Sequence, residues 1–452
     1  MSGRPNFLFL IADDLTYRSI HSLNNKEVDT PNLDRLVREG ACFTHCFHQG
    51  SWSAAVCVPS RVMLNSGLSA FRAQKLLDSV PLWGQSLGKA GYETYIAGKW
   101  HLDPTSLQRS FKQMGPIGPG MFESTPEAYH RPSPGNHWSP SDKSLKGHWL
   151  DTSLWLNAPH REMRHSCSIW ALEAVAHLTK VAAKQQNPFF MYVGFNEPHD
   201  PRQSPREYLD KYPQARIEIP PNYLPEHPFN EGDHTIRDEL LAPFPRTKEA
   251  VRLHRSEYYA LISYLDYQVG VILQALERSG KAENTYVILT ADHGLAVGEH
   301  GLMGKQNMYD HSIRMPLLIS GPGIAKGKRI DELVYQHSLF ATTCELAGVP
   351  APSTVEFPSL AGLLRDGRSK GQEAVFCYYK NFQRAVRTKE HKLIVYPQAA
   401  MVQLFDMVND PWEARNLASD PKYASIKNDL MQRLQEIRTE LGDPLLHADD
   451  KS

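Results

Sequence analysis

Four short apolar runs constrain the fold of this chain more than any other feature. They occupy residues 7–12, 94–97, 189–195 and 286–290. Runs of this length and apolar character fit strands that are buried on both faces of a parallel sheet. We therefore expect these four segments to lie together in the interior of the protein.

Helical patterns separate the predicted strands. Residues 30–37 begin with Thr30 as the expected N-cap and Pro31 at the first helical position, and Gly40 follows as a stop signal. Residues 249–278 repeat apolar side chains at three- and four-residue spacing, which predicts a long helix with one buried face. Strands that alternate with helices predict an α/β fold, in which helices cover both faces of a large, mostly parallel sheet.

The pattern changes beyond about residue 350. Short alternating strands are predicted at residues 374–379, 383–388 and 392–396, and a helix at 422–441. At 452 residues the chain is long enough for one large α/β domain with an appendage, or for two domains. We predict a main α/β domain over residues 1–350 and a small α+β subdomain, with an antiparallel sheet and a helix, over 351–452.

Two segments, 108–161 and 201–245, have little periodicity, and the first is rich in Pro, Gly, Ser, His and Trp. We interpret both as long ordered loops. In an α/β fold such loops usually lie over the active face and shape access to it.

Composition narrows the classes of partner. Forty-nine Lys and Arg against 50 Asp and Glu give a net charge of -1, which offers no electrostatic reason for binding to nucleic acid or to an anionic membrane. Six cysteines are too few for a disulfide framework, and their spacing lacks the pairs of a zinc site. The first apolar run is too short to span a bilayer. We expect a cytoplasmic protein with no membrane partner, although an exported chain whose leader had been removed would look the same.

Charged or imidazole side chains follow each predicted strand. They are Asp13 with Asp14, Lys99 with His101, His199, and Asp292 with His293. An Asp pair after one strand is most often a turn or a helix cap, and a lone histidine is most often structural. Because the carboxyl ends of parallel strands meet in one crevice, four such groups together indicate a single site. Its oxygen-rich ligands suit Ca²⁺ or Mg²⁺, and His293 would also accept Mn²⁺ or Zn²⁺.

The pentapeptide at residues 57–61 resembles the signature of a known family. Cys57-Val58-Pro59-Ser60-Arg61 with Gly67 downstream is similar to Cys-x-Pro-Ser-Arg followed by Thr-Gly, the signature of the type I, formylglycine-dependent sulfatases of the alkaline phosphatase superfamily. This chain has Ser66-Gly67-Leu68 where the family usually has Thr-Gly-Arg, and Ser66 keeps the hydroxyl. Further motifs fall in the family order: Pro5-Asn6-Phe7 through Asp13-Asp14, Thr30-Pro31-Asn32-Leu33-Asp34, Gly98-Lys99-Trp100-His101, Pro198-His199-Asp200-Pro201, and Thr290-Ala291-Asp292-His293-Gly294 through to Lys305.

The resemblance implies an alkaline phosphatase-like fold and a metal centre. A maturation enzyme would oxidise Cys57 to formylglycine, and the hydrate of that aldehyde would be the nucleophile. The resemblance further implies that Ca²⁺, with Mg²⁺ or Mn²⁺ as alternatives, is bound by Asp13, Asp14, Asp292, His293 and the modified Cys57.

The resemblance also assigns the remaining roles. Arg61 would hold the hydrated aldehyde, and Lys99 would bind both the aldehyde and the sulfate. His199 and Lys305 would assist departure of the alcohol. His101 would remove a proton from the second hydroxyl, which expels sulfate and restores the aldehyde.

Family membership does not fix the substrate. The segment from Gly298 to Lys305 resembles that of iduronate sulfatases and of choline sulfatase, so we expect a sulfated carbohydrate first and a small alkyl sulfate second. A phosphonate monoester or phosphodiester hydrolase of the same superfamily is one alternative, and a binding protein in which Cys57 is never modified is another. Trp and His residues within 137–165 would suit stacking on a sugar, but loop aromatics more often pack the loop itself. We leave them outside the predicted site, together with His45, His48 and His300.

Overall fold

A large central sheet organises the computed structural model, which describes residues 3–123, 147–156, 161–365, 367 and 369–447. Its eight strands lie in the order β11 (Lys328–Tyr335), β2 (Ala41–Phe47), β10 (Arg314–Ser320), β9 (Thr285–Ala291), β1 (Asn6–Ala12), β8 (Phe189–Gly194), β4 (Glu93–Lys99) and β5 (Gln113–Gly118). β10 runs antiparallel to both of its neighbours, and every other pair in this sheet is parallel. The predicted mostly parallel sheet is confirmed, and β1 lies between β8 and β9.

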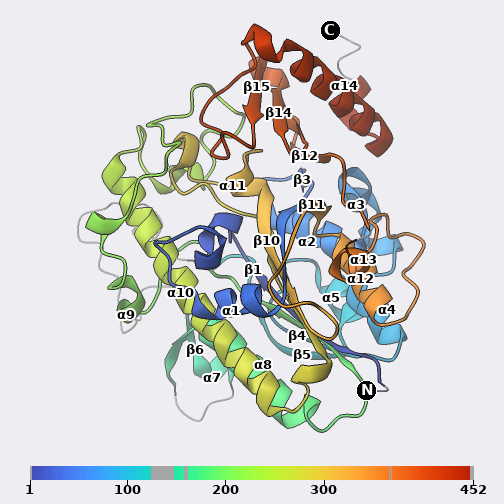
Figure 1. Ribbon diagram of the computed structural model, residues 1–452. Coiled ribbons are helices and arrows are strands. Elements are labelled where there is room, and N and C mark those ends of the chain that lie inside the picture. The colour runs from blue at the N-terminus through green and yellow to red at the C-terminus, as the bar shows by residue number, and fades with distance from the viewer. Residues whose placement is uncertain (1–2, 124–146, 157–160, 366, 368, 448–452) are drawn as a thin grey trace.

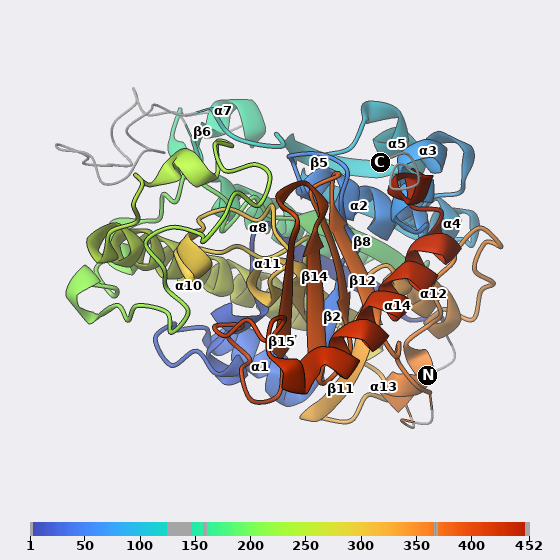
Figure 2. The same ribbon diagram turned by 90° about the horizontal axis from the view of Figure 1, so that it is seen from above.

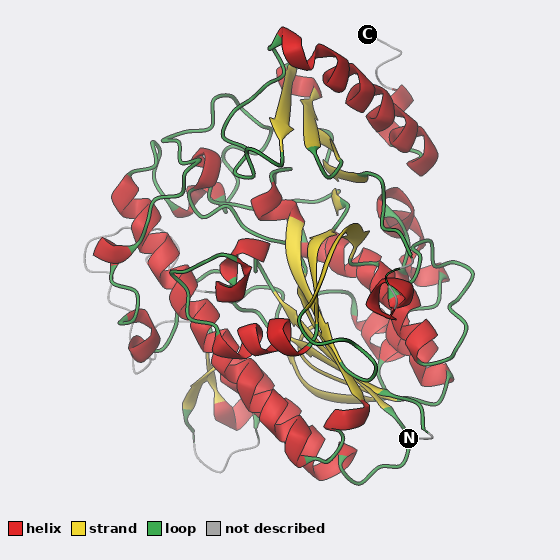
Figure 3. Cartoon of the chain, viewed as in Figure 1, coloured by secondary structure: helices red, strands yellow, loops and turns green. Residues whose placement is uncertain are grey.

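Helices cover both faces of this sheet (Figures 1 and 3). One face carries α1 (Pro31–Glu39), α8 (Ser166–His177) and α10 (Lys248–Arg278), and the other carries α2 (Cys57–Ser66), α4 (Trp83–Lys89) and α12 (Ser338–Leu346). Every residue of β1, β8 and β9 is buried, because these strands have helices on both sides. The four predicted strands are confirmed as β1, β4, β8 and β9.

The two predicted helices are present as α1 and α10. Thr30 is the N-cap residue of α1, as expected, but its side chain makes no capping hydrogen bond. The carboxylate of Asp266, on α10, caps the helix instead. It accepts from the backbone N–H groups of Asn32 and Leu33, at 3.0 and 2.7 Å. The start of α1 is therefore fixed to α10.

A smaller sheet has five strands, in the order β15 (Met401–Asp406), β14 (His391–Tyr396), β13 (Gln383–Arg387), β12 (Val375–Tyr379) and β3 (Gly50–Ser51). β12 to β15 are antiparallel, as predicted, and α14 (Ala424–Leu441) lies across them (Figure 2). β3 comes from the N-terminal part of the chain and pairs in parallel with β12. The small sheet thus joins residues on both sides of position 350, and the division into domains there stays a prediction.

The two predicted loops hold short elements where the structure describes them. These are β6 (Trp149–Asp151) with α7 (Thr152–Trp155) in the first loop and α9 (Arg206–Leu209) in the second, while α5 (Pro104–Ser110) and β7 (Met163–His165) flank the first. Residues 124–146 and 157–160, which include His137, Trp138 and His160, lie outside the described residues. Further short helices are α3 (Ala70–Leu76), α11 (Asp310–Ile313) and α13 (Ala361–Arg365). No described helix combines the length and apolar character that crossing a bilayer requires.

Candidate active site

The predicted site residues lie where four neighbouring strands end. Asp13 and Asp14 follow β1, and Asp292 and His293 follow β9; Lys99 is the last residue of β4, and His199 lies in the loop after β8. Because these strands run parallel and adjacent, their carboxyl ends bring all of these side chains to one place. The side chains of both Asp residues after β1, of Lys99 and of both residues after β9 have no exposed surface.

Two residues of the site have left-handed backbone conformations. Asp14 has φ of 70° and His101 has φ of 62°, which is uncommon for residues other than glycine. The hydroxyl of Tyr258, on α10, donates to the backbone oxygen of Asp14 at 2.6 Å and accepts from the N–H of Thr16 at 3.2 Å. α10 therefore holds the turn that carries the Asp13–Asp14 pair.

Three buried ligand atoms in the site lack hydrogen-bond partners. They are Oδ1 of Asp13, Oδ2 of Asp14 and Nε2 of His293. The Nδ1 of His293 lies 3.1 Å from the backbone oxygen of Gly294, a contact in which Nδ1–H donates and Nε2 keeps a free lone pair. Ligand atoms of Asp13, Cys57 and His293 all lie within 4.8 Å of one another. Buried polar atoms without partners are costly, and a divalent cation beside Cys57 would satisfy Oδ1 of Asp13 and Nε2 of His293, while a ligand atom of Asp14 lies with those of His199 and Asp200. The donor set therefore fits the predicted metal.

Cys57 is the first residue of α2, and Arg61 lies one turn further along the same helix. The guanidinium of Arg61 donates to Oδ2 of Asp292 and to the backbone oxygen of Lys99, both at 2.9 Å. Ser60 donates to the backbone oxygen of Asp292 at 2.6 Å. α2 is thus tied to the ends of β9 and β4, and these bonds fix the position of Cys57 beside the carboxylates. The helix N-terminus adds partial positive charge at that point.

Two lysines neutralise the carboxylates. Lys99 donates from Nζ to Asp13, and Lys305 donates to Oδ1 of Asp14 at 2.9 Å. Burial acts to raise the pKa of Asp13, but Lys99 and other cations outweigh it and hold that pKa well below its ordinary value. Burial raises the pKa of Asp14 to about 6, although Lys305 acts in the opposite direction. Burial also acts to lower the pKa of Lys305, but Asp14 and Asp238 outweigh it and keep the ammonium protonated.

Cys57, His101, His199 and Lys305 line one cavity of about 310 Å³. Burial, assisted by Lys99, lowers the pKa of His101 to about 3, and burial together with Lys305 lowers the pKa of His199. Both imidazoles are therefore neutral at pH 7 in the free protein. Nδ1–H of His199 donates to the backbone oxygen of Asp200 at 2.6 Å, which leaves its Nε2 facing Asp14 at 4.0 Å.

Arg237 and Asp238 also line this cavity, and the sequence patterns did not single them out. Asp238 lies 4.0 Å from Nζ of Lys305 and accepts from Gln306 at 2.7 Å, while Arg237 forms an ion pair with Asp200. Both residues belong to the aperiodic segment 201–245. That segment was predicted to shape access to the site, and these two side chains do so.

The three histidines left outside the predicted site do not line this cavity. His300 stacks on Tyr309, with ring centroids 3.7 Å apart, and its Nε2 lies 3.0 Å from the backbone oxygen of Glu413. Nδ1 of His48 accepts from the backbone N–H of Gly50 at 2.8 Å. His45 contacts Thr44 and faces a different cavity, described below. These contacts hold loops and strands in place.

Solved structures share this architecture. A phosphonate monoester hydrolase of Agrobacterium radiobacter has a TM-score of 0.76 at 21% identity, covering 97% of this chain and 96% of that chain. A protein solved in complex with its substrate D-glucosamine-2-N,6-O-disulfate has a TM-score of 0.75 at 21% identity, covering 97% and 98%. The chain therefore has the alkaline phosphatase-like fold, which the motifs predicted.

The family follows from the sequence comparisons. The family model described as Sulfatase matches residues 5–349, and the model for the C-terminal region of N-sulphoglucosamine sulphohydrolase matches residues 298–440. The protein belongs to the sulfatase family and is a sulfuric ester hydrolase. Similar proteins include the choline-sulfatase of Rhizobium meliloti, 28% identical with 93% of this chain and 84% of that protein covered, and the iduronate 2-sulfatase of Mus musculus, 29% identical with 80% and 72% covered.

Proposed function

We propose that the protein hydrolyses the sulfate ester of a carbohydrate, using the hydrate of a formylglycine at position 57 and a bound Ca²⁺. The observation that carries the proposal is the position of Cys57. It shares one cavity with His101, His199 and Lys305, and its sulfur lies within 4.8 Å of metal-ligand atoms of Asp13 and His293. The sulfur stands where the hydroxyl oxygens of the hydrate would be.

The cation would be held by Asp13, Asp14, Asp292 and His293, with Mg²⁺ or Mn²⁺ as alternatives to Ca²⁺. When bound, it supplies positive charge that holds an oxygen of the sulfo group and stabilises the charge that grows there. Lys99 contacts the Asp13 carboxylate, and the proposal assigns to its ammonium a second sulfo oxygen. The site thus provides several positive charges for one anionic ester.

A formylglycine hydrate supplies one hydroxyl for attack on sulfur and a second whose deprotonation lets sulfate leave without attack by water. Arg61 is held by Asp292 and by the Lys99 backbone, and it fixes the residue at position 57. A thiol at this position offers no such elimination. Oxidation of Cys57 would therefore explain why a cysteine lies among oxygen ligands that suit a hard cation.

Different residues of the cavity wall donate and accept protons in the proposed reaction. Lys305 stays protonated because Asp14 and Asp238 raise its pKa against the effect of burial, so it donates toward the oxygen of the departing alcohol, with His199 beside it. His101 is neutral because burial lowers its pKa to about 3, and it accepts the proton of the second hydroxyl. A neutral imidazole is the form of histidine that can accept this proton.

The choice of a carbohydrate rests on the relatives and on the size of the cavity. The N-acetylglucosamine-6-O-sulfatase of Bacteroides thetaiotaomicron is 24% identical, with 97% of this chain and 87% of that protein covered. A cavity of about 310 Å³ suits one sugar ring, and the polar side chains of Arg237 and Asp238 lie on its wall. The choline-sulfatase relative and the phosphonate monoester hydrolase fold neighbour support the two alternatives, a small alkyl sulfate and a phosphonate ester.

A turnover panel on one preparation tests the proposal. We expect desulfation of sulfated mono- or oligosaccharides to be faster than hydrolysis of choline sulfate or of an aryl phosphonate. Activity on choline sulfate alone would overturn the carbohydrate assignment, and a faster reaction with the phosphonate would overturn the preference for sulfate.

The state of position 57 needs a separate measurement. Mass spectrometry of the peptide that contains Cys57, from protein made in its native host, is expected to show the aldehyde. A free thiol in active protein would overturn the proposed nucleophile, since the thiol would then be the catalytic form.

A further inference from the structure

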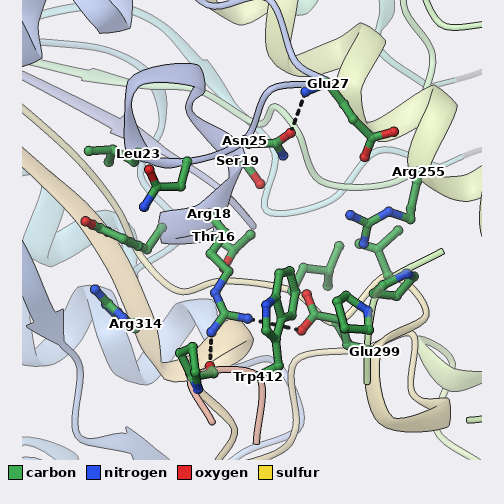
Figure 4. Close-up of a pocket in the computed structure, with 18 of the residues that line it drawn as sticks. Thr16, Arg18, Ser19, Leu23, Asn25, Glu27, Arg255, Glu299, Arg314 and Trp412 are labelled. Atoms are coloured by element: carbon green, nitrogen blue, oxygen red, sulfur yellow. Dashed lines mark hydrogen bonds and ion pairs between the residues drawn. The ribbon is translucent and has the colours of Figure 1, made fainter. Parts of the chain in front are cut away.

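A second cavity, of about 700 Å³, lies in a different part of the protein and is larger than the active-site cavity. Its walls come from segments 16–27 and 218–221, from α10, from the loop after β9 and from the C-terminal segment 407–412 (Figure 4). Among the described residues, none lines both cavities. Cavities that bind small molecules are usually of about 300–1,000 Å³, so this one is large enough for a ligand of several rings.

The walls carry an excess of positive charge. Five basic residues line the second cavity, against three glutamates. Figure 4 shows Arg314 and Arg255 on opposite sides of the view with Arg18 between them, Glu299 beside Arg18, and Glu27 above Arg255. Both of these glutamates already have partners: Glu299 pairs with Arg18 at 3.6 Å, and Glu27 accepts from the backbone N–H of Glu218 at 2.8 Å. Arg314 and Arg329 are paired as well, with Asp310 at 3.4 Å and Asp331 at 3.0 Å, so the case for an anion rests on Arg255.

Arg255 is the buried cation of this cavity that lacks an acidic partner. It is 9% exposed, and its Nη2 donates to the hydroxyl of Tyr259 at 2.5 Å. Its Nε is buried without a hydrogen-bond partner, and no carboxylate of the described chain forms an ion pair with this side chain. Buried guanidinium groups are normally paired with anions, because an unpaired charge is costly to remove from water. An anionic group of a ligand would supply the missing partner.

A flat aromatic surface lies in the same cavity. The guanidinium of Arg18 lies over the ring of Trp412, 4.0 Å from its centroid, and Trp412 keeps part of its surface exposed. Arg18 also donates to the backbone oxygen of Pro411. The indole and the guanidinium of Arg18 together offer an aromatic surface beside an anion donor. A sugar ring that bears an acidic group presents the complementary pair of features.

We propose that this cavity is a second, non-catalytic binding site for an anionic saccharide, with the sulfate or carboxylate group held by Arg255 and Arg18 and the sugar ring packed on Trp412. The inference rests on the proposed function for the choice of a saccharide, since the substrate proposed for the active site belongs to the same chemical class. The unpaired guanidinium of Arg255 by itself requires only an oxyanion.

The second cavity is joined to the active site through two segments. The loop after β9 contributes Val297 and Glu299 to the second cavity and Lys305 to the active site, and Gly298 N–H donates to Leu302 across it at 2.8 Å. Tyr258 lines the second cavity and donates to the backbone oxygen of Asp14. Tyr258 therefore connects the wall of the second cavity to the turn that carries the metal ligands.

Isothermal titration calorimetry tests the proposal without turnover. A sulfated tetrasaccharide and inorganic sulfate are titrated into the Cys57→Ala protein, and into the same protein with Arg255→Gln or, as the matched control, Arg415→Gln. Arg415 is a surface arginine with a side chain that is 76% exposed. We expect two binding events for the tetrasaccharide, of which Arg255→Gln weakens one by at least about tenfold, because it removes a charge-assisted hydrogen bond, while Arg415→Gln changes neither.

A second variant and the comparison of the two ligands test the remaining parts of the proposal. Trp412→Leu is expected to weaken the same event for the tetrasaccharide without weakening that for sulfate, and it supplies the test should Arg255→Gln fail to fold. Unchanged binding in both variants would overturn the proposal, and equal affinity for sulfate and tetrasaccharide would overturn recognition of the sugar. If the proposed function is wrong, the event at the active site is missing, and the Arg255-dependent event is still measured.

Discussion

The two cavities of this protein handle buried charge in opposite ways. In the active site each buried cation meets a carboxylate: Lys99 pairs with Asp13, Lys305 with Asp14 and Arg61 with Asp292. Those residues lie at or just after the ends of strands and on α2, except for Lys305, which lies in the loop after β9. In the second cavity Arg255 has a phenol as its described partner and no ion pair. Paired charges on a rigid sheet suit chemistry that needs fixed geometry, whereas an unpaired cation in a cavity suits binding of an anion from outside.

The largest expected effect is the loss of activity when Cys57, in the active-site cavity, is replaced. Cys57→Ala should lower kcat for sulfate ester hydrolysis by at least about 10⁴-fold, because removal of a nucleophile leaves only binding and charge stabilisation. Cys344→Ala is the matched control, since Cys344 is equally buried but lies on α12, outside both cavities. Steady-state kinetics with a sulfated sugar measures both. Retention of activity in Cys57→Ala would place the nucleophile elsewhere.

The second prediction compares two buried arginines by stability. Arg61→Gln should lower the free energy of unfolding by about 3–5 kcal/mol, because Asp292 is left as an uncompensated buried charge. Arg255→Gln should change that free energy by no more than about 1 kcal/mol, since the loss of a hydrogen bond to Tyr259 is offset by removal of an unpaired buried charge and no carboxylate is stranded. Urea denaturation of both variants measures the difference. Equal losses would contradict the contrast between the cavities.

Removal of metal should affect one cavity alone. Dialysis against EDTA is expected to abolish activity and to lower the free energy of unfolding by about 2.7 kcal/mol relative to protein at a Ca²⁺ concentration 100 times its Kd. Added Ca²⁺ should restore both. In the Asp13→Asn variant the chelator should have little effect on the melting temperature. The Arg255-dependent binding event should persist in EDTA, and its loss would mean that the two cavities are not separate.

The smallest expected effect concerns pH. Burial lowers the pKa of His101, in the active site, and of His45, in the second cavity, to about 3. The unfolded chain takes up a proton near pH 6.5 that the folded chain does not, so stability is present at neutral pH and is lost as pH falls below 6.5 toward 3. Each histidine should contribute about 2 kcal/mol of this loss between pH 6.5 and 5.

The variants His101→Gln and His45→Gln resolve the two contributions. Each should reduce the pH dependence of the free energy of unfolding by a similar amount, as urea titrations at the two pH values would show. Only His101→Gln should lower kcat. A loss of activity in both variants would mean that the second cavity also takes part in catalysis.

The strands that could be predicted from the sequence are those whose burial leaves an apolar run in it. β1, β4, β8 and β9 lie in the sheet interior and each contains a short apolar run, so they could be predicted. β11, at the sheet edge, mixes charged residues such as Asp331 and Glu332 with apolar ones and lacks that pattern. The cap of α1 could not be predicted either. Thr30 is the usual residue type for that position, but the capping carboxylate of Asp266 belongs to a distant helix.

The active site was more predictable than its surroundings. Strand ends in a parallel sheet meet by necessity, so the positions of Asp13, Lys99, His199 and Asp292 near one another follow from the order of the strands. Asp238 reaches the same cavity from a loop with no periodicity, and no local pattern signals that. The second cavity depends on how the C-terminal segment with Trp412 packs against residues 16–27, which only the tertiary structure shows.

Cys57 and the residues that anchor α2 are buried once the chain has folded: Cys57 is 2% exposed, and Ser60 and Arg61 have no exposed surface. A modifying enzyme cannot bind a segment that is enclosed in this way. If Cys57 is oxidised as proposed, its burial means that the modifying enzyme would have to act before α2 packs. The fraction of active molecules would then depend on whether modification precedes the packing of α2. A molecule that folded first would stay unmodified until it unfolded.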